Sequence, residues 1–406
     1  MKTVKVTSKS FQKLCSRSLV GRKRVYLTVQ RIIEDIRLHG DDALIRYTKK
    51  FDGVKLAPKE LRVTETEVSG AYQDINPEFV NTLKMVIENV NKFYKKETRK
   101  SWKIMDGDGV MLGDSYRPLE SVGVYIPSGT VPLVSSVYMT VLPAKIAGVE
   151  RIVLVTPPNK YKSVDPHILV VADLLKVKEI YKVGGSQAIA ALALGTKTIP
   201  KVDKIVGPGN AYVAEAKRQV FGYVDIDMIA GPSEVVIVAN RYSNPAYIKA
   251  DLLAQSEHSM GLSILVTLSK RLAGLMKKEV EKGYIIQVEN IEQAAEVVNK
   301  LAPEHLEIMI KNPNRFLKLI KNAGAIFVGP YTPTAVGDYI AGPSHVLPTG
   351  GTARFFSGLC VKDFMKSTHI ISYSKKALEK GRDSLEKLTK IEKLEKHFDS
   401  IKVRFE

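Results

Sequence analysis

The sequence predicts an α/β protein in which two tandem domains, each built on a parallel sheet, lie between a helix-rich N-terminal region and a small C-terminal tail. Short apolar strands, glycine turns and helices alternate through residues 121–232, and a second alternation follows through 233–365. The links between these elements are short, which favours right-handed βαβ units. Before residue 120 apolar residues instead recur every three or four positions, as in helices. We therefore expect four regions, at 1–120, 121–232, 233–365 and 366–406.

The N-terminal region is expected to be helical from residue 18 to about 99. Residues 29–36 and again 79–90 carry apolar side chains at helical spacing, with charged residues between them. We expect this region to pack on the second α/β domain.

In the first α/β domain each expected strand is a short apolar run. The strands are expected at 121–125, 151–156, 180–183, 204–206 and 225–230, and the helices at 134–149, 165–176 and 186–194. Gly231, Pro232 and Ser233 then interrupt the apolar pattern, so the chain is expected to leave this domain near residue 232.

The elements of the second α/β domain and of the tail are predicted from the same sequence patterns. Strands are expected at 234–239, 263–267, 284–288 and 325–328, and helices at 244–257, 270–282 and 291–301. Another helix is expected after Pro303. Two such domains in tandem leave a cleft between them. The tail is expected to form an amphipathic helix at 375–396 and a strand at 401–405, with a thin apolar stripe that would gain from docking on another subunit.

Composition excludes several classes of protein. With 45% hydrophobic and 26% charged residues, the chain is globular rather than disordered or fibrous. Its two cysteines, Cys15 and Cys360, cannot form a disulfide framework and offer no CxxC metal site. The sequence has no signal-peptide pattern and no run of eighteen apolar residues, so we expect a cytoplasmic protein that does not bind membranes.

The net charge leaves the partner open. Lys and Arg number 61 and Asp and Glu number 43, which gives +18. This charge suits phosphate-bearing partners, and a basic nucleic-acid-binding protein is the non-enzyme alternative. The basic residues are spread over helix faces, however, and the sequence has no zinc knuckle or aromatic-basic motif. We therefore expect no nucleic-acid partner.

Two pairs of polar residues are candidates for chemistry. Gln255 and His258 are three residues apart at the end of an expected helix, so both side chains face the same way and could share one ion. Glu304 and His305 follow a proline, and a partly desolvated carboxylate and an imidazole can both act as bases near neutral pH. The alternatives are a solvated helix end for the first pair and a helix N-terminus that complements the dipole for the second.

Four further residues are candidates in loops and in the tail. Asp338 and His345 lie in a turn bounded by glycines, where the backbone can approach a ligand and a carboxylate can bind a divalent cation. Glu392 and His397 lie on the expected tail helix. Taken singly, each of the four can equally be a surface residue.

Two glycine clusters each follow a strand and open a helix. One is Gly184-Gly185-Ser186-Gln187 and the other is Gly207-Pro208-Gly209-Asn210. Free N–H groups at such helix N-termini can bind pyrophosphate. Neither cluster is a complete G-x-G-x-x-G fingerprint, and the P-loop pattern is absent from the sequence.

Taken together, these segments resemble the histidinol dehydrogenase family, and the likeness is colinear over nearly the whole chain. The stretches that carry it are GVYIPSGTVPLVSSVYMTVLPAKIAGV from residue 123, VGGSQAIAALALGT from 183, KIVGPGNAYVAEAKRQVFG from 204, DMIAGPSEV from 227, DLLAQSEHS from 251, APEHLE from 302, NAGAIFVG from 322, GDYIAGPSHVLPTGG from 337 and the tail His397. The resemblance implies that each α/β domain is incomplete and Rossmann-like, and that the tail is exchanged within a homodimer.

The resemblance also implies a set of site residues. One zinc ion per subunit would be held by Gln255, His258 and Asp338 and by His397 of the other subunit. The catalytic residues would be Glu304 and His305. The NAD contacts would be Tyr125, Gln187 and Asn210. The substrate would meet Ser233, Gln255, His258, His305, Asp338, Glu392 and His397, with His345 assisting.

The implied activity is the zinc-dependent, NAD-linked oxidation of L-histidinol through L-histidinal to L-histidine, the last two steps of histidine biosynthesis. In that scheme His305 takes the hydroxyl proton, Glu304 deprotonates the water that attacks the aldehyde, and His305 assists the second oxidation. The alternative within this class is an NAD-dependent dehydrogenase of another small alcohol, such as a sulfonated diol. Glu392 and His397 favour histidinol, because they would meet its amine and complete a zinc site that its imidazole can join.

Overall fold

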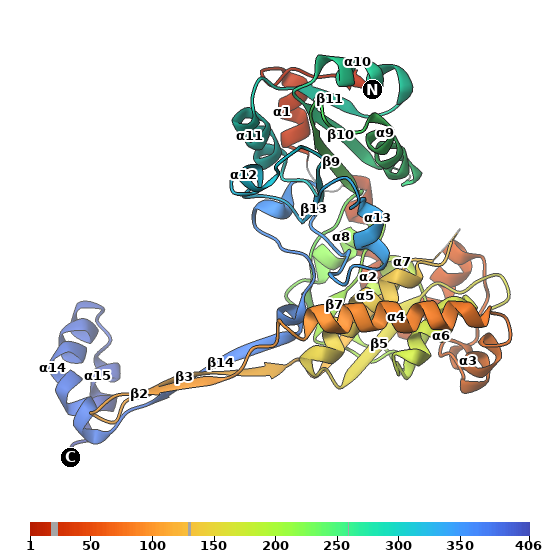
Figure 1. Cartoon of the computed structure of the whole chain (residues 1–406). Coiled ribbons are helices and arrows are strands. Elements are labelled where there is room, and N and C mark those ends of the chain that lie inside the picture. The colour runs from red at the N-terminus through yellow and green to blue at the C-terminus, as the bar shows by residue number, and fades with distance from the viewer. Residues whose placement is uncertain (18–22, 129–130, 259) are drawn as a thin grey trace. The chain divides into compact units, whose positions relative to one another are not determined.

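The computed structural model divides into two compact units (Figure 1). The described residues are 1–17, 23–128, 131–258 and 260–406. Unit 1 consists of Met1–Glu97 and Leu119–Phe364, and unit 2 consists of Thr98–Pro118 and Met365–Glu406. Both parallel sheets belong to unit 1, and the predicted α/β fold is confirmed.

The first sheet is parallel throughout, with the strand order β6-β5-β4-β7-β8. Its strands are β4 (Ser121–Tyr125), β5 (Arg151–Thr156), β6 (Glu179–Lys182), β7 (Lys204–Val206) and β8 (Asp225–Ile226). The first four lie within one residue of the predicted ranges, because a short apolar run buried on both faces is typical of a parallel strand. The prediction of 225–230 is too long, since β8 pairs only with the short strand β7.

Helices cover this sheet and connect its strands. They are α5 (Val134–Ala147), α6 (Pro166–Leu174), α7 (Gly185–Leu194) and α8 (Ala211–Val220). On one face, Val153, Val155 and Ile205 share a buried core with α7 and α8. Helix α5 packs on α6 and contacts β4.

The N-terminal helices differ from the prediction in where they pack. They are α2 (Lys23–Asp52), α3 (Glu65–Ala71) and α4 (Pro77–Tyr94). Packing on the second α/β domain was expected, and for α2 and α3 this is wrong: α2 packs on α7 and α8, and α3 packs on α6. The reason is that Val29, Ile32 and Ile36 complete the core of the first sheet. Helix α4 packs on α5, and its Tyr94 hydroxyl also donates to Leu359 O.

The second sheet is also parallel, with the order β1-β11-β10-β9-β12-β13. Its strands are β1 (Lys2–Thr3), β9 (Glu234–Ala239), β10 (Leu262–Thr267), β11 (Tyr284–Gln287), β12 (His305–Ile308) and β13 (Ala325–Val328). Strand β1 comes from the N-terminus, so this sheet is built from two stretches of chain separated by the whole first sheet.

Helices lie on both faces of this sheet (Figure 1). The helices are α1 (Lys9–Cys15), α9 (Pro245–Ala254), α10 (Lys270–Glu279), α11 (Ile291–Leu301) and α12 (Asn314–Leu317). Val236 and Val238 pack in a core with α1, α11 and α12, whereas Val235 and Ile237 pack with α9 and α10.

Two local predictions in this region are wrong. A helix was expected after Pro303, but the chain forms β12, which lies between β9 and β13 with all four residues buried. Burial on both faces of a central strand accounts for the apolar residues of this run. Asp338 was expected in a glycine-bounded turn, but it lies on the short helix α13 (Thr334–Tyr339). The 3-10 helices are η1 (Pro58–Glu60), η2 (Gln255–Glu257), η3 (Thr352–Arg354) and η4 (Val361–Phe364).

Unit 2 is an antiparallel sheet in the order β14-β3-β2 followed by two helices. Its elements are β2 (Trp102–Met105), β3 (Met111–Pro118), β14 (Met365–Ser372), α14 (Lys375–Ile391) and α15 (Glu395–Lys402). The tail expected at 366–406 therefore also includes residues from before position 120. The helix expected at 375–396 is interrupted at Lys393, whose φ is 57°. The strand expected at 401–405 is wrong, because α15 continues through Lys402. Within the described residues, no helix combines the length and apolar character needed to cross a membrane.

Candidate active site

A cavity of about 430 Å³ in unit 1 is lined by residues from segments next to both parallel sheets. The first sheet contributes the loop residues Pro208 and Gly209 and the start of α5. The second sheet contributes polar side chains that the sequence singled out. These are Ser233, His258, Glu304, His305, Asp338 and His345.

His305 is the first residue of β12 and Glu304 directly precedes it; they are 4% and 6% exposed. Both are held by the backbone of Glu234 on the neighbouring strand β9. The Glu234 N–H donates to Glu304 Oε2 at 2.8 Å, and the Glu234 carbonyl accepts a hydrogen bond from His305 Nδ1 at 3.0 Å. Because a carbonyl oxygen can only accept, Nδ1 carries a proton, and in the neutral ring the free lone pair is on Nε2.

The charges around His305 favour its protonated form. Its Nδ1 lies 3.4 Å from Glu304 Oε2, and its Nε2 lies 3.6 Å from Asp338 Oδ1, beyond hydrogen-bonding distance. Burial lowers the pKa of His305, but the carboxylates of Glu304 and Asp338 outweigh it and hold this pKa well above the usual range. The Nε2 atom, which is buried without a hydrogen-bond partner, is thus available to a ligand in the cavity.

Asp338 is surrounded by imidazoles. Burial raises its pKa, but His305, His345 and His258 together lower that pKa below the usual range. His345 is fixed by two contacts: its Nδ1 lies 3.0 Å from Asp338 O, and its Nε2 lies 3.3 Å from Ser136 Oγ. The carboxylate is therefore kept ionised, which is the form that binds a cation.

Gln255 lies beside His258 rather than on the cavity wall. It is 5% exposed, and its Nε2 is buried without a hydrogen-bond partner. A Cβ added to Gly261 would lie 2.2 Å from Gln255 O, so only a glycine can approach the backbone of Gln255 this closely. In the described chain no three His, Cys, Asp or Glu side chains converge as a metal site.

The expected NAD contacts lie at two helix N-termini. Tyr125 is buried and its hydroxyl accepts a hydrogen bond from Gly185 N–H at 3.1 Å; burial raises its pKa to about 12. Gln187 is 1% exposed, and both polar atoms of its amide lack hydrogen-bond partners among the described residues. Asn210 is exposed and caps α8 by accepting from the N–H groups of the second and third residues that follow it.

The loop that leads to Asn210 requires glycine. Gly207 has a φ of 116°, and a Cβ there would lie 2.1 Å from Tyr125 O. Lys217 Nζ donates to Gly207 O at 3.0 Å and also pairs with Asp227, which accepts from Gly207 N–H. The buried ion pair of Lys217 and Asp227 therefore holds this loop in place.

Glu392 and His397 belong to unit 2. Glu392 caps the C-terminus of α14, His397 lies on α15, and both are exposed. Their roles stay predictions.

Comparison with known proteins decides the family. The family model described as histidinol dehydrogenase matches residues 15–405. The chain belongs to the histidinol dehydrogenase family. It is 48% identical to the histidinol dehydrogenase of Caldanaerobacter subterraneus subsp. tengcongensis over 97% of this chain and 96% of that protein. It is 47% identical to that of Clostridium acetobutylicum over 98% and 96%. The crystal structure of histidinol dehydrogenase from Elizabethkingia anophelis matches with a TM-score of 0.93 and 35% identity, over 100% of this chain and 98% of that one.

Membership in the histidinol dehydrogenase family makes the chain an oxidoreductase, which confirms the predicted class of enzyme. The roles of individual residues, the metal and the cofactor stay predictions.

Three features of this histidinol dehydrogenase family member were missed from the sequence. Glu234 holds both candidate bases through its backbone, and the available signal was an acid at the head of the apolar strand VVIVA. Arg17 pairs with Glu234, but it stands among many basic residues and gives no signal of its own. Asp251 and Glu307 form a carboxyl pair that no local spacing predicts, because they come from different elements.

Proposed function

We propose that the chain oxidises L-histidinol through L-histidinal to L-histidine. The observation that carries the proposal is the buried pair of Glu304 and His305, directed into a cavity that Asp338 and His258 also line. The relatives' names point to histidinol as the substrate. NAD, when bound, supplies the acceptor for the hydride that leaves the substrate carbon in each oxidation.

In the first oxidation His305 is the base. Its Nε2 lies at the cavity. A cation held at Asp338 would offset that carboxylate and lower the pKa of His305, so that the ring could lose its Nε2 proton; with Nδ1–H donating to Glu234 O, the neutral ring would then present its lone pair to the substrate. His305 takes the proton of the substrate hydroxyl while the hydride leaves the same carbon, which gives the aldehyde.

In the second oxidation Glu304 and His305 have different roles. Glu304 takes a proton from a water molecule, whose oxygen adds to the aldehyde carbon, while His305 returns the proton it took in the first oxidation to the aldehyde oxygen, and the hydrate forms. Because Glu304 Oε2 accepts from Glu234 N–H, we assign the proton to Oε1. His305 then takes a hydroxyl proton of the hydrate as the second hydride leaves, and the product is the carboxylic acid.

Zinc suits the donor set. Imidazole from His258 and carboxylate from Asp338 are ligands found in zinc sites that keep room for a substrate, and the amide oxygen of Gln255 would add a weaker oxygen donor. The Nε2 atom of the buried Gln255 amide has no hydrogen-bond partner among the described residues, so no such bond fixes the orientation of the amide, and its oxygen can turn toward a bound group. Zinc, when bound, would hold the substrate's imidazole and amine and so fix the reacting carbon. We assign the remaining ligand to His397 of the other subunit, and place Glu392 at the substrate amine.

The NAD assignment rests on similar features. The amide of Gln187, at the N-terminus of α7, has no hydrogen-bond partner among the described residues. The glycine turn before Asn210, at the N-terminus of α8, lets the backbone approach a ligand closely. Tyr125 contacts the N-terminus of α7 through Gly185.

Unit 2 supports the proposed homodimer. Large apolar side chains are exposed on its strands and helices, which is typical of a surface buried in an assembly. They include Trp102, Ile104, Met105, Ile371, Leu388 and Ile391. We propose that a second copy covers them, that the active site is shared, and that the enzyme works in the cytoplasm.

The test measures NADH formed per molecule of L-histidinol by the purified zinc-loaded protein. We expect two NADH per histidinol and no accumulation of free histidinal, because both oxidations occur in one cavity. One NADH per histidinol with free aldehyde would contradict the two-step proposal. A sulfonated diol assayed beside histidinol should give little NADH, and a preference for the diol would contradict the proposed substrate.

A further inference from the structure

The backbone of Glu234, the first residue of β9, contacts both proposed catalytic side chains. Its N–H donates to Glu304 Oε2 and its carbonyl accepts from His305 Nδ1. A small displacement of this one residue would therefore move the proton-accepting atoms of Glu304 and His305 together. What fixes Glu234 thus fixes the geometry of the reaction.

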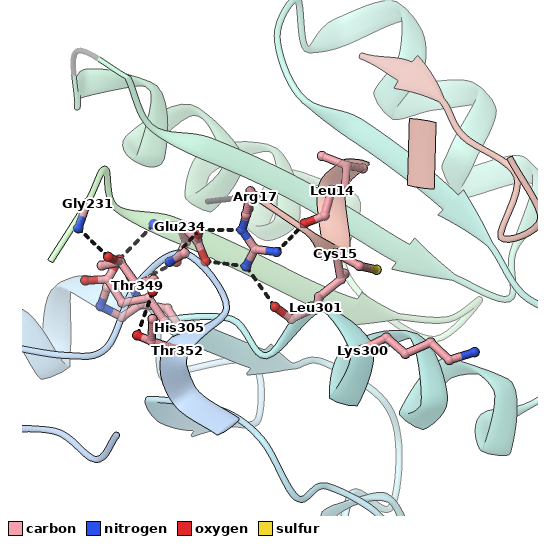
Figure 2. A network of polar contacts seen from close by, with 12 residues as sticks. Leu14, Cys15, Arg17, Gly231, Glu234, Lys300, Leu301, His305, Thr349 and Thr352 are labelled. Atoms are coloured by element: carbon pink, nitrogen blue, oxygen red, sulfur yellow. Dashed lines mark hydrogen bonds and ion pairs between the residues drawn. The ribbon is translucent and has the colours of Figure 1, made fainter. Parts of the chain in front are cut away.

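The Glu234 side chain is fixed by an arginine from the N-terminal region (Figure 2). Its carboxylate is 5% exposed and contacts Arg17 through both oxygens, with Nε–Oε1 at 2.5 Å and Nη2–Oε2 at 2.6 Å. Gly350 N–H also donates to Oε1, at 2.9 Å. A guanidinium that binds both oxygens fixes the plane of the carboxylate as well as its position.

Arg17 is itself held in place. Its Nη2 donates to Leu301 O at 2.8 Å and its Nη1 donates to Leu14 O. Its side chain is only 16% exposed. Arg17 thereby links the ends of α1 and α11 to the start of β9.

A second contact fixes the segment before β9. Thr349 Oγ1 accepts a hydrogen bond from Gly231 N–H (Figure 2). Thr349 directly precedes Gly350, which binds Glu234. Separate stretches of chain thus converge on the residue whose backbone holds Glu304 and His305.

We propose that Arg17 is a positioning residue for the oxidation: by clamping Glu234 it keeps Glu304 and His305 in register with the substrate. The inference rests on the proposed roles of these two residues. Arg17 lies outside the set of described residues that line the cavity, so it should affect kcat rather than the binding of substrate. A displacement of about 1 Å at reacting groups costs about 10²-fold in rate.

The first test replaces Arg17 by lysine. An ammonium group keeps the positive charge but cannot bind both carboxylate oxygens, so the charge balance is kept and the orientation is lost. We expect Arg17→Lys to lower kcat for L-histidinol about 10- to 100-fold while KM for histidinol and NAD stays within about threefold. The matched control is Arg151→Lys, because Arg151 binds both oxygens of Glu179 at 2.7 and 2.9 Å on the first sheet, and its kcat should match wild type.

The second test is chemical rescue, with circular dichroism used to measure the folded fraction. Arg17→Ala should have a lowered kcat per folded molecule, and millimolar methylguanidinium chloride should restore part of it, whereas equal sodium chloride should not. The inference is overturned if Arg17→Lys keeps a kcat within about twofold of wild type, or if the activity lost by both variants equals the loss of folded protein. A wild-type protein that does not oxidise histidinol would instead contradict the proposed function.

Discussion

Asp251 on α9 and Glu307 on β12 place two carboxyl groups close enough to shift each other's pKa. Glu307 is 1% exposed; its Oε1 accepts a hydrogen bond from Thr334 N–H at 3.0 Å, and its Oε2 is buried without a partner. The partly buried Asp251 and the buried Glu307 favour a proton on the pair, because two neighbouring carboxylates repel each other when both are ionised. Burial, followed by the charge of Asp251, raises the pKa of Glu307 to about 8, and burial also raises the pKa of Asp251.

This pair predicts that the protein loses stability as the pH rises from 5 to 9. The pKa of Glu307 is raised from 4.5 to about 8 on folding, so the folded state binds the proton more tightly. The stability from this proton is complete below 4.5 and is lost as the pH rises through 8. Glu307→Gln keeps the shape without ionising, so its melting temperature should fall less over this range. The control is Glu296→Gln, at an exposed position on α11. Parallel curves for all three proteins would contradict the shared proton.

Glu304→Gln should separate the two half-reactions. The amide oxygen of glutamine can still accept from Glu234 N–H, so the geometry is kept while the base is lost. Oxidation of histidinal should fall by about 10²- to 10⁴-fold, and oxidation of histidinol to the aldehyde should fall much less. Single-turnover NADH formation from each substrate measures this, and equal losses in both would refute the division of roles.

His305→Asn should impair both half-reactions, because a proton leaves a substrate oxygen in each. The expected loss is about 10²- to 10⁴-fold for histidinol and for histidinal alike. His39→Asn is the control, since His39 is an exposed residue of α2. If the His305 variant oxidised either substrate at the wild-type rate, the base in that step would be another group.

Asp338→Asn should remove zinc without unfolding unit 1. Asp338 is a side chain 29% exposed on a short helix, so the loss of one charge should leave the circular dichroism spectrum unchanged. Zinc measured by atomic emission should fall from about one per subunit to well below one, since a neutral amide is a weaker ligand than a carboxylate. Asp42→Asn, at an exposed position of α2, should keep its zinc. Full zinc occupancy in the Asp338 variant would exclude this residue as a ligand.

A mixture of two inactive variants tests the shared site. After reversible dissociation, His305→Asn and His397→Ala subunits should form some heterodimers with one intact site, so activity should return. Deletion of the residues after Lys390 should remove both zinc and activity while the two parallel sheets stay folded. If the mixture stays inactive, or if a monomer in solution is fully active, the ligands come from one chain.

Several elements could be predicted from the sequence because a local signal determines them. Strands β4, β5, β7, β9 and β13 have the predicted bounds, since each is an apolar run that ends at polar, glycine or proline residues. Strand β12 was missed because Glu304 and His305 interrupt the apolar run, and only its position between β9 and β13 makes it a strand. The antiparallel sheet of unit 2 was missed because β3 pairs with β14 across some 250 residues.

In the candidate site, too, local sequence signals could be predicted and long-range contacts could not. Glu304, His305, His258 and Asp338 meet at one cavity, and each lies in a motif of unusual polar residues. The contribution of Glu234 to the two bases is made by its backbone, which every residue type possesses, so no side-chain pattern could reveal it. The Arg17–Glu234 contact joins residues 217 positions apart and follows only from the assembled sheet.

The placement of β1 in the second sheet affects the order in which the nascent chain can fold during synthesis. The first sheet is contiguous in sequence, so a nascent chain can complete it once β8 has emerged. Residues 2–3 are still unpaired at that point, because their partners at 284–285 are synthesised much later. Arg17 lies in the same N-terminal stretch. Gly350, which also binds Glu234, is synthesised later still. The active site should therefore be among the last parts of unit 1 to acquire its native geometry, after nearly all of the unit has been synthesised.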